Sequence, residues 1–126
     1  MRLIRTTLTT AAACLVAATA VAQSAAPGPF VMATYYRCDY VQQTRADTLY
    51  KKVMVPALEN QIKAGRLTAY GFSSHRIGGE YRRLETMTAP TLELLIAAQE
   101  AEIAELEKTN PKGSAEFDAI CGTHVD

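Results

Sequence analysis

The chain has 126 residues, with 13 basic and 13 acidic side chains and a hydrophobic fraction of 48%. This balanced charge gives no basic surface of the kind that binds nucleic acid or an anionic membrane, so neither partner is expected. The length allows one small domain with a modest core, which covalent or oligomeric support would help to stabilise.

The N-terminal segment, residues 1–22, is predicted to be a secretory signal peptide. Arg2 and Arg5 are followed by a stretch without charged side chains that lasts until Arg37. A basic start before an uncharged apolar stretch is typical of an export signal. The apolar centre, at about residues 11–22, is shorter than the roughly 20 residues that cross a bilayer, so no stable membrane anchor is expected.

The cleavage site is predicted after Ala22, because Ala20 and Ala22 form an Ala-x-Ala pattern. The mature protein is therefore expected to be periplasmic or secreted. The alternative is a lipidated Cys14, which is disfavoured because Ala11 stands where such sites usually have Leu. Residues 23–29 are rich in Pro and Gly and predict a flexible lead-in to one α+β domain at residues 30–126.

Two cysteines remain after cleavage, Cys38 and Cys121. An even pair in an oxidising compartment usually forms a disulfide, and this bond is predicted here; closing so long a loop stabilises by about 4 kcal/mol in chain-entropy models. The alternative is a metal site, because Cys121 and His124 have the C-x-x-H spacing of zinc ligands. Cys38 and either Asp118 or Asp126 would complete it, but the disulfide uses the same sulfurs, so no metal is expected.

The first predicted elements are a strand and a helix. Residues 30–37 are dense in aromatic and β-branched side chains, which predicts a strand with both faces covered. Residues 44–64 carry apolar side chains at helical spacing and end at Gly65, a residue type favoured just after a helix. Pro56 lies inside this pattern, so a kink or two shorter helices are expected.

A β-hairpin is predicted next. Residues 67–76 alternate between two faces, Gly78-Gly79 interrupts the pattern, and a second alternating run follows at about residues 80–88. A glycine pair between two alternating runs is typical of a hairpin, so the two strands are predicted to be antiparallel neighbours.

The clearest predicted helix follows Pro90, whose position suits a first helical turn, and ends before Asn110. Its inward side is predicted to comprise Leu92, Leu95, Ile96, Gln99, Ile103 and Leu106. The glutamates of this helix, together with Lys51-Lys52, are expected to be solvated. Ser114 is expected to cap a short helical tail.

The order strand, helix, strand, strand, helix predicts an α+β fold. Because a helix lies in the connection between the first two predicted strands, the second strand can run parallel to the first. The expected architecture is a ferredoxin-like antiparallel sheet with two main helices on one face.

Three segments resemble exported, uncharacterised members of the dimeric α/β-barrel superfamily. They are Tyr35-Tyr36-Arg37-Cys38, the helix end and strand at residues 62–71, and the hairpin Gly78-Gly79-Glu80-Tyr81. The resemblance implies a homodimer in which two open sheets face each other and enclose a cavity. The final strand usual in that superfamily is not evident after Cys121.

In such a dimer, a partner subunit would cover large side chains if these lie on the free face of the sheet. The side chains considered for that face are Phe30, Met32, Tyr36, Tyr70 and Phe72.

The leading functional hypothesis is a non-catalytic dimer that binds a small apolar or aromatic molecule, with Tyr36, Tyr70 and Phe72 as candidate ligand contacts and no cofactor. The first alternative is a haem-dependent or cofactor-free monooxygenase, with His75 as ligand or acid–base group and Arg76 or Tyr70 assisting. His75 is also compatible with an ordinary surface residue of a hairpin. The second alternative is a disulfide-stabilised structural or interaction module.

Overall fold

The computed structural model describes residues 28–125, the last three by their backbone alone. The predicted signal peptide, its cleavage site, the lipidation alternative, most of the lead-in and Asp126 lie outside the described residues. The elements, in chain order, are β1 (Phe30–Arg37), α1 (Gln43–Leu49), η1 (Tyr50–Met54), α2 (Val55–Lys63), β2 (Ala69–Ser74), β3 (Arg83–Ala89), α3 (Leu92–Thr109), α4 (Pro111–Ile120) and β4 (Thr123–Val125).

The strands form a four-stranded sheet in the order β2-β3-β1-β4, and each neighbouring pair is antiparallel. The predicted hairpin is confirmed, with Gly78 and Gly79 at φ 65° and 84° in its loop. Because β1 and β2 are both antiparallel to β3, they run parallel to each other, as the helical connection predicted. The final strand that is not evident in the sequence after Cys121 is present in the structure: β4 pairs with the end of β1. Its three residues are too few to show an alternating pattern.

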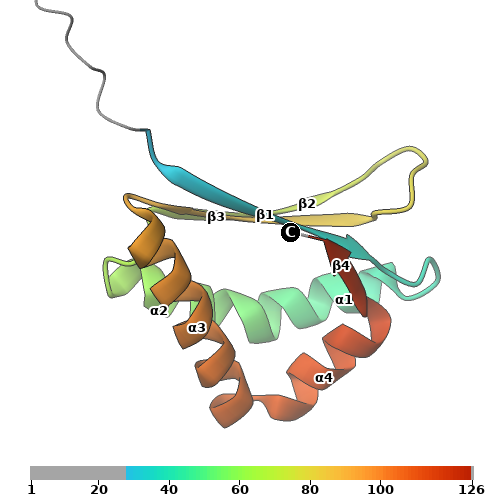
Figure 1. The fold of residues 1–126 in the computed structure, drawn as a ribbon. Helices are drawn as coiled ribbons and strands as arrows, with labels where there is room; N and C mark the ends of the chain where they lie inside the picture. Colours follow the sequence, from blue (N-terminus) through green and yellow to red (C-terminus); the bar gives the residue numbers. More distant parts are fainter. Residues whose placement is uncertain (1–27, 126) are drawn as a thin grey trace, which may run out of the picture.

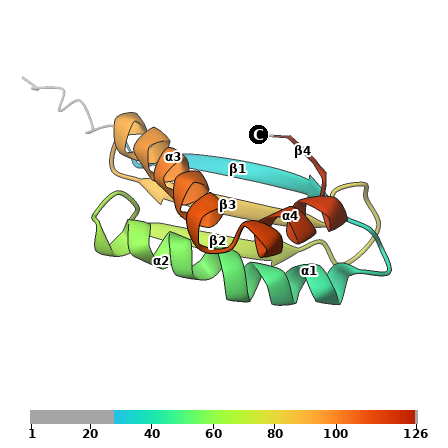
Figure 2. The same cartoon turned by 90° about the horizontal axis from the view of Figure 1, so that it is seen from below.

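All the helices of the described chain lie on one side of the sheet, so the fold has two layers (Figure 1). The α1–η1–α2 segment runs as one long helical stretch, and α3 and α4 meet at an angle beneath the sheet (Figure 2). The predicted α+β class with helices on one face is confirmed.

The other side of the sheet is uncovered within the described chain. Along β3 the odd-numbered residues from Arg83 to Ala89 are buried against the helices, whereas the even-numbered ones are only partly buried. Val31 and Tyr35 on β1 share that outer side and are 58% and 43% exposed. Within the described chain, only the helix side of β1 is covered, so the prediction of two covered faces is not met by these residues; apolar side chains on both sides of a strand do not reveal whether both sides have a neighbour.

The large side chains that were considered for the free face lie mainly on the helix side instead. Met32, Tyr36, Tyr70 and Phe72 all pack against the buried core. Phe72 stacks on Tyr50 with ring centroids 3.7 Å apart. The alternation of β1 and β2 was predicted correctly, but the pattern alone does not say which face meets the helices.

The helix that contains Pro56 is divided by a π-helical turn, which confirms the expected interruption. Val55 donates its backbone N–H to the carbonyl oxygen of Tyr50, five residues earlier. A proline lacks the N–H for the next bond, and its ring would clash with the carbonyl four residues before it in a regular α-helix. The wider turn relieves that clash. It also holds Tyr50 and Met54 buried.

The predicted buried side of helix α3 is confirmed in part. Leu95 and Leu106 are buried as expected, but Ala98 and Glu102 are buried with them, whereas Leu92, Ile96 and Ile103 are about half exposed. The prediction that all its glutamates are solvated is wrong for Glu102, which is 5% exposed. The helix packs against α2 as well as the sheet, and this second neighbour rotates its buried side away from Ile96 and Ile103.

The ends of the last two helices are set by side-chain caps. The Thr91 side chain accepts a hydrogen bond from the Leu94 backbone at 3.2 Å, so Pro90 lies just before the cap and not in the first turn. Asn110 caps α4 by accepting from the Gly113 backbone at 3.2 Å. The prediction of Ser114 as that cap is therefore wrong. Pro111 starts the helix one turn earlier, where a missing N–H costs nothing.

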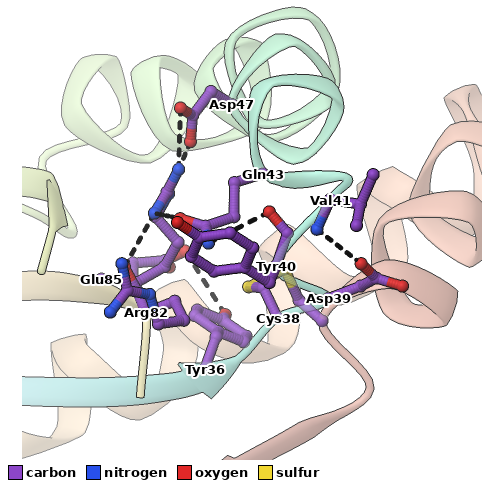
Figure 3. Close-up of a disulfide and its surroundings, with 11 residues drawn as sticks. Tyr36, Cys38, Asp39, Tyr40, Val41, Gln43, Asp47, Arg82 and Glu85 are labelled. Atoms are coloured by element: carbon purple, nitrogen blue, oxygen red, sulfur yellow. Dashed lines mark hydrogen bonds and ion pairs between the residues drawn. A yellow bond between two sulfur atoms is a disulfide. The ribbon is translucent and has the colours of Figure 1, made fainter. Parts of the chain in front are cut away.

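The predicted disulfide is confirmed. Cys38 and Cys121 are joined with an S–S distance of 2.05 Å, which links the end of β1 to the end of α4 (Figure 3). The Asp39 backbone N–H also donates to the Ile120 carbonyl at 2.9 Å beside this bond. Two distant parts of the chain are therefore tied together at one corner of the fold.

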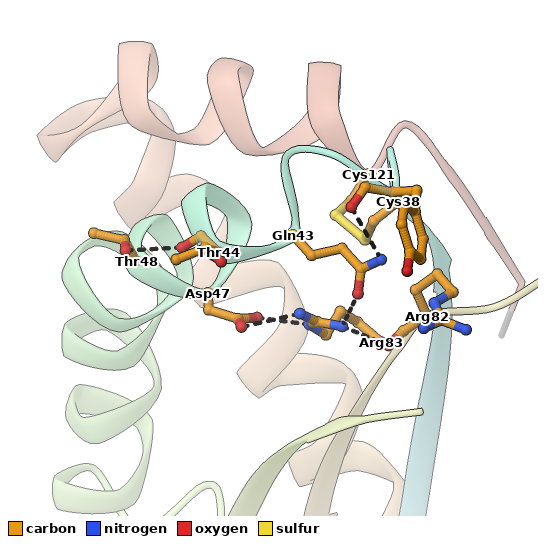
Figure 4. A network of polar contacts seen from close by, with 9 residues as sticks. Cys38, Gln43, Thr44, Asp47, Thr48, Arg82, Arg83 and Cys121 are labelled. Carbon is orange, nitrogen blue, oxygen red and sulfur yellow. Dashed lines mark hydrogen bonds and ion pairs between the residues drawn. A yellow bond between two sulfur atoms is a disulfide. The ribbon is translucent and has the colours of Figure 1, made fainter. Parts of the chain in front are cut away.

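A buried arginine ties β3 to α1 near the disulfide. Arg83 donates two hydrogen bonds to the Asp47 carboxylate, at 2.6 and 2.9 Å, and a third to the Gln43 side-chain oxygen at 2.8 Å (Figure 4). The Arg83 side chain is 4% exposed, so its charge depends on these partners.

Candidate functional site

A cavity of about 560 Å³ lies between the helix-facing side of the sheet and the helices, and it is named here the helix-side cavity. Its floor is formed by the strand residues Met32, Thr34, Tyr36, Glu85 and Met87. Its walls and mouth include Met54, Gln99, Glu102, Ile103, Leu106, Glu107, Ala115 and Asp118.

The sheet register explains which strand residues lie side by side at the floor of the helix-side cavity. Alternate residues of a strand share a face, and residues directly opposite each other on neighbouring strands lie side by side. Met32 lies opposite Met87, and Thr34 lies opposite Glu85. The two strands therefore present an apolar pair and a polar pair next to each other, both directed toward the helices.

Acidic side chains dominate the charge of the helix-side cavity. Glu85, Glu102, Glu107 and Asp118 all line it, and its described lining contains no Lys, Arg or His. Glu85 and Glu102 are 4% and 5% exposed, so these two carboxyl groups lie at the buried end. Burial of a carboxylate without a cationic partner is unfavourable.

This unfavourable burial applies most clearly to Glu102. It makes no hydrogen bond or ion pair with any residue that the structure describes. Burial, reinforced by repulsion from Glu85 and Glu105, raises the pKa of Glu102 to about 8. At neutral pH the side chain is therefore mainly a neutral carboxylic acid that lines a cavity.

Glu85 is accompanied by two tyrosines. The Tyr36 hydroxyl donates to the Glu85 carboxylate at 3.4 Å, and both residues are labelled in Figure 3. The Tyr50 hydroxyl is buried near Glu85 without a hydrogen bond of good geometry to any described residue. Burial, followed by the charges of Glu85 and Glu102, raises the pKa of Tyr50 well above its usual value.

Thioethers supply much of the apolar wall. Met32, Met54 and Met87 are the methionines of the described residues, and all three line the helix-side cavity. Methionine side chains are flexible and polarisable, so they adapt to ligands of different shape and make favourable contacts with aromatic rings.

The predicted ligand contacts are not brought together. Tyr36 lines the helix-side cavity, but Tyr70 and Phe72 do not. Tyr70 donates to Glu59 at 2.6 Å, and Phe72 is stacked on Tyr50.

The residues considered for catalysis lie elsewhere in the fold. His75 lines a separate pocket of about 370 Å³ at the β2–β3 loop, together with Tyr35 and Tyr81. Its ring makes no hydrogen bond within the part of the chain that the structure covers. Arg76 is exposed, and neither it nor Tyr70 lines this pocket. His75, Arg76 and Tyr70 therefore do not line a common pocket.

The sulfurs required by the metal alternative, Cys38 and Cys121, are bonded to each other. Among the described residues, no three His, Cys, Asp or Glu side chains are grouped so that they could hold a metal ion.

The two buried glutamates were missed by the sequence analysis, although the sequence does contain a pattern that includes them. Glu85 lies two residues from Met87 on the same face of a strand. Glu102 lies at helical spacing from Ala98 and Leu106. A glutamate within an apolar stripe of this kind is the pattern that indicates a buried carboxyl.

No known protein family model matches the chain, and no curated protein matches it with significant similarity. Within the described residues, no helix has the length and apolar character needed to span a membrane.

Proposed function

We propose that this chain is an exported binding protein that holds a small molecule in the helix-side cavity and forms a homodimer through the uncovered side of its sheet. The observation that carries the proposal is the buried, unpartnered carboxyl group of Glu102 in a cavity of about 560 Å³. Small-molecule sites commonly measure about 300–1,000 Å³ and combine an apolar wall with a few polar groups.

The strand order supports a ferredoxin-like fold of the dimeric α/β-barrel type. The order β2-β3-β1-β4, with all pairs antiparallel and helices on one side, fits the β-α-β-β-α-β arrangement of that fold. In such a dimer the two uncovered sheet sides face each other.

The uncovered side, named here the open sheet face, supports dimerisation by its shape and chemistry. It comprises Val31, Ala33, Tyr35, Ala69, Gly71, Ser73, Leu84, Thr86 and Thr88. These side chains are mostly small and uncharged; at the end of β1, Arg37 continues this side and pairs with Glu80, and Tyr81 of the β2–β3 loop lies against Tyr35. At Gly71 a Cβ would lie 2.8 Å from the Thr86 hydroxyl oxygen, so glycine leaves room for the Thr86 side chain. A sheet face of mostly small, uncharged side chains is best covered by a second sheet.

Export is supported by two features of different parts of the chain. The Cys38–Cys121 disulfide is a bond that persists in oxidising compartments such as the periplasm. The N-terminal residues carry the basic start and Ala-x-Ala pattern of a signal peptide.

Native mass spectrometry of the unreduced protein, purified from the periplasm, tests this proposal. We expect a cleaved dimer, with one disulfide per chain and an additional small-molecule mass. Ala115→Trp, at the cavity mouth, should abolish the additional mass. Ala119→Trp should retain it, because Ala119 is exposed on the same helix but does not line the cavity. A protein that neither retains nor takes up any small molecule from cell extract would contradict the binding role, and a monomer would contradict the assembly.

Proton transfer is a second candidate function, favoured by the pKa of about 8 of Glu102. A carboxyl group that titrates near neutral pH can act as a general acid or base. The retained molecule is incubated with fresh protein and then compared by chromatography with the starting material. Conversion by the wild type but not by Glu102→Gln would identify an enzyme, and an unchanged molecule would identify a binding protein.

A further inference from the structure

We infer that the ligand of the helix-side cavity is an organic cation, namely a protonated amine with an apolar body, and that its ammonium group binds beside Glu102 and Glu85. This inference rests on the proposed binding function and specifies its ligand class.

The charge of the cavity favours a cation. Its described lining contributes four carboxyl groups, at Glu85, Glu102, Glu107 and Asp118, and no basic side chain. An anionic ligand would be repelled at both the mouth and the buried end. A cation would be attracted along the same path, from the outer pair to the inner pair.

The unpartnered state of Glu102 favours a ligand that donates hydrogen bonds. The carboxyl group is 5% exposed and has no hydrogen-bond partner in the described chain. An ammonium group carries three donors, so it can bond Glu102 and Glu85 together. A charge-assisted bond of this kind offsets the unfavourable burial of the carboxylate. A neutral apolar ligand would leave that group unpaired.

The size and wall of the cavity favour an organic cation over a metal ion. A single ion would leave most of about 560 Å³ unfilled. Met32, Met54 and Met87 provide a flexible apolar wall for the body of an amine. The Tyr36 ring, which also lines the cavity, can contact an aliphatic or aromatic group.

Amine binding is expected to release a proton from Glu102. The other titratable groups around it are Glu85 on β3, Tyr36 on β1, Tyr50 on η1, Glu105 and Glu107 on α3, and Asp118 on α4. None of these groups is a basic side chain that would compete with the amine for the Glu102 carboxylate. If the ammonium group binds only the ionised form, affinity rises about tenfold between pH 7 and pH 9 as Glu102 ionises.

The test is isothermal titration calorimetry of the mature protein with two matched pairs of probes, 2-phenylethylamine with 2-phenylethanol, and hexylamine with hexan-1-ol. We expect each amine to bind at least about tenfold more tightly than its alcohol at pH 8.5, because the ammonium group adds an ion pair with the carboxylate that the hydroxyl cannot make. Glu102→Gln should remove this preference and the dependence on pH. Glu100→Gln should retain both, because Glu100 is exposed on the same helix.

The outcomes separate this inference from the proposed function. Amines and alcohols that bind equally well, with no effect of Glu102→Gln, would overturn the cation while leaving the cavity as a binding site. Probes that all fail to bind, together with no retained molecule in native mass spectrometry, would contradict both. Titrations in two buffers of different ionisation enthalpy measure proton release directly, and release of about one proton per bound amine at pH 7 in the wild type but not in Glu102→Gln supports the inference.

Discussion

Glu85 on β3 and Glu102 on α3 line the same buried end of one cavity, where the charge of Glu85 adds to burial in raising the pKa of Glu102. One comes from the floor of the cavity and the other from its wall. A fold without a ligand gains nothing from placing Glu102 here, because a buried carboxyl group that has no hydrogen-bond partner in the described chain is less stable than an uncharged side chain of the same size. Such local conflicts are expected mainly at functional sites.

The first prediction concerns the pH dependence of stability. The pKa of Glu102 is raised to about 8 in the fold, whereas in the unfolded chain it is about 4.3. The unfolded state therefore loses its proton first, and the contribution of Glu102 to stability falls as pH rises from about 4 to 8. Glu102→Gln should stabilise the protein by on the order of 3 kcal/mol at pH 7 and have little effect at pH 4.

Urea unfolding of the wild type and Glu102→Gln at pH 4, 7 and 9 measures this difference. Glu100→Gln serves as the control, because its side chain is exposed at the same helix. A substitution at Glu102 that destabilises equally at all three pH values would contradict a buried, protonated carboxyl group.

The second prediction concerns the disulfide. Cys38 and Cys121 are separated by 83 residues, and closing a loop of this length stabilises by about 4.5 kcal/mol in the chain-entropy model. Replacing both by Ala should therefore lower the free energy of unfolding by several kcal/mol. Urea unfolding of the double variant, compared with the wild type under reducing and non-reducing conditions, measures this. Equal midpoints for all samples would show that the bond is absent in solution.

The third prediction concerns the ion pair of Arg83. Asp47→Ala leaves the buried guanidinium without its carboxylate and should cost about 2–3 kcal/mol, less than the 3–5 kcal/mol of a fully buried pair because Asp47 is partly exposed. Glu116→Ala breaks the exposed pair with Arg45 and should cost less than about 1 kcal/mol. Chemical unfolding of both variants gives the comparison. Similar losses would contradict the dependence on burial.

The fourth prediction concerns the open sheet face. Thr86 lies on β3, one of the two inner strands, so Thr86→Arg should place a charge in the proposed dimer interface and convert the protein to a monomer. Thr44→Arg adds the same charge at an exposed position of helix α1 and should leave the dimer intact. Analytical ultracentrifugation distinguishes these states. Dimers of unchanged stability in both variants would locate the interface elsewhere.

Much of the fold follows from local sequence patterns. The strand at residues 30–37 was predicted with its observed bounds. Gly65 ends the first long helical segment with φ 72°, a conformation that glycine adopts without strain. The disulfide also followed from counting cysteines in a chain with a predicted export signal. Each of these depends on residues close in the sequence, or on a pair without competitors.

The candidate site depended on information that local patterns lack. Whether Met32 and its neighbours face the helices or the open sheet face depends on contacts between distant segments, since β1 has apolar side chains on both faces. The burial of Glu102 depends on how α3 is rotated between α2 and the sheet. Strand β4 has only three residues and forms by pairing with β1. These features arise between distant segments, so the cavity was not predicted.

Methyl NMR of the mature protein labelled at its methionines tests the central claim most directly, because Met32, Met54 and Met87 line the helix-side cavity from three different elements. Addition of 2-phenylethylamine should shift all three methyl signals in the wild type and none in Ala115→Trp, whereas Ala119→Trp should behave as the wild type does. Binding detected by calorimetry that leaves these signals unchanged would contradict the helix-side cavity as the site.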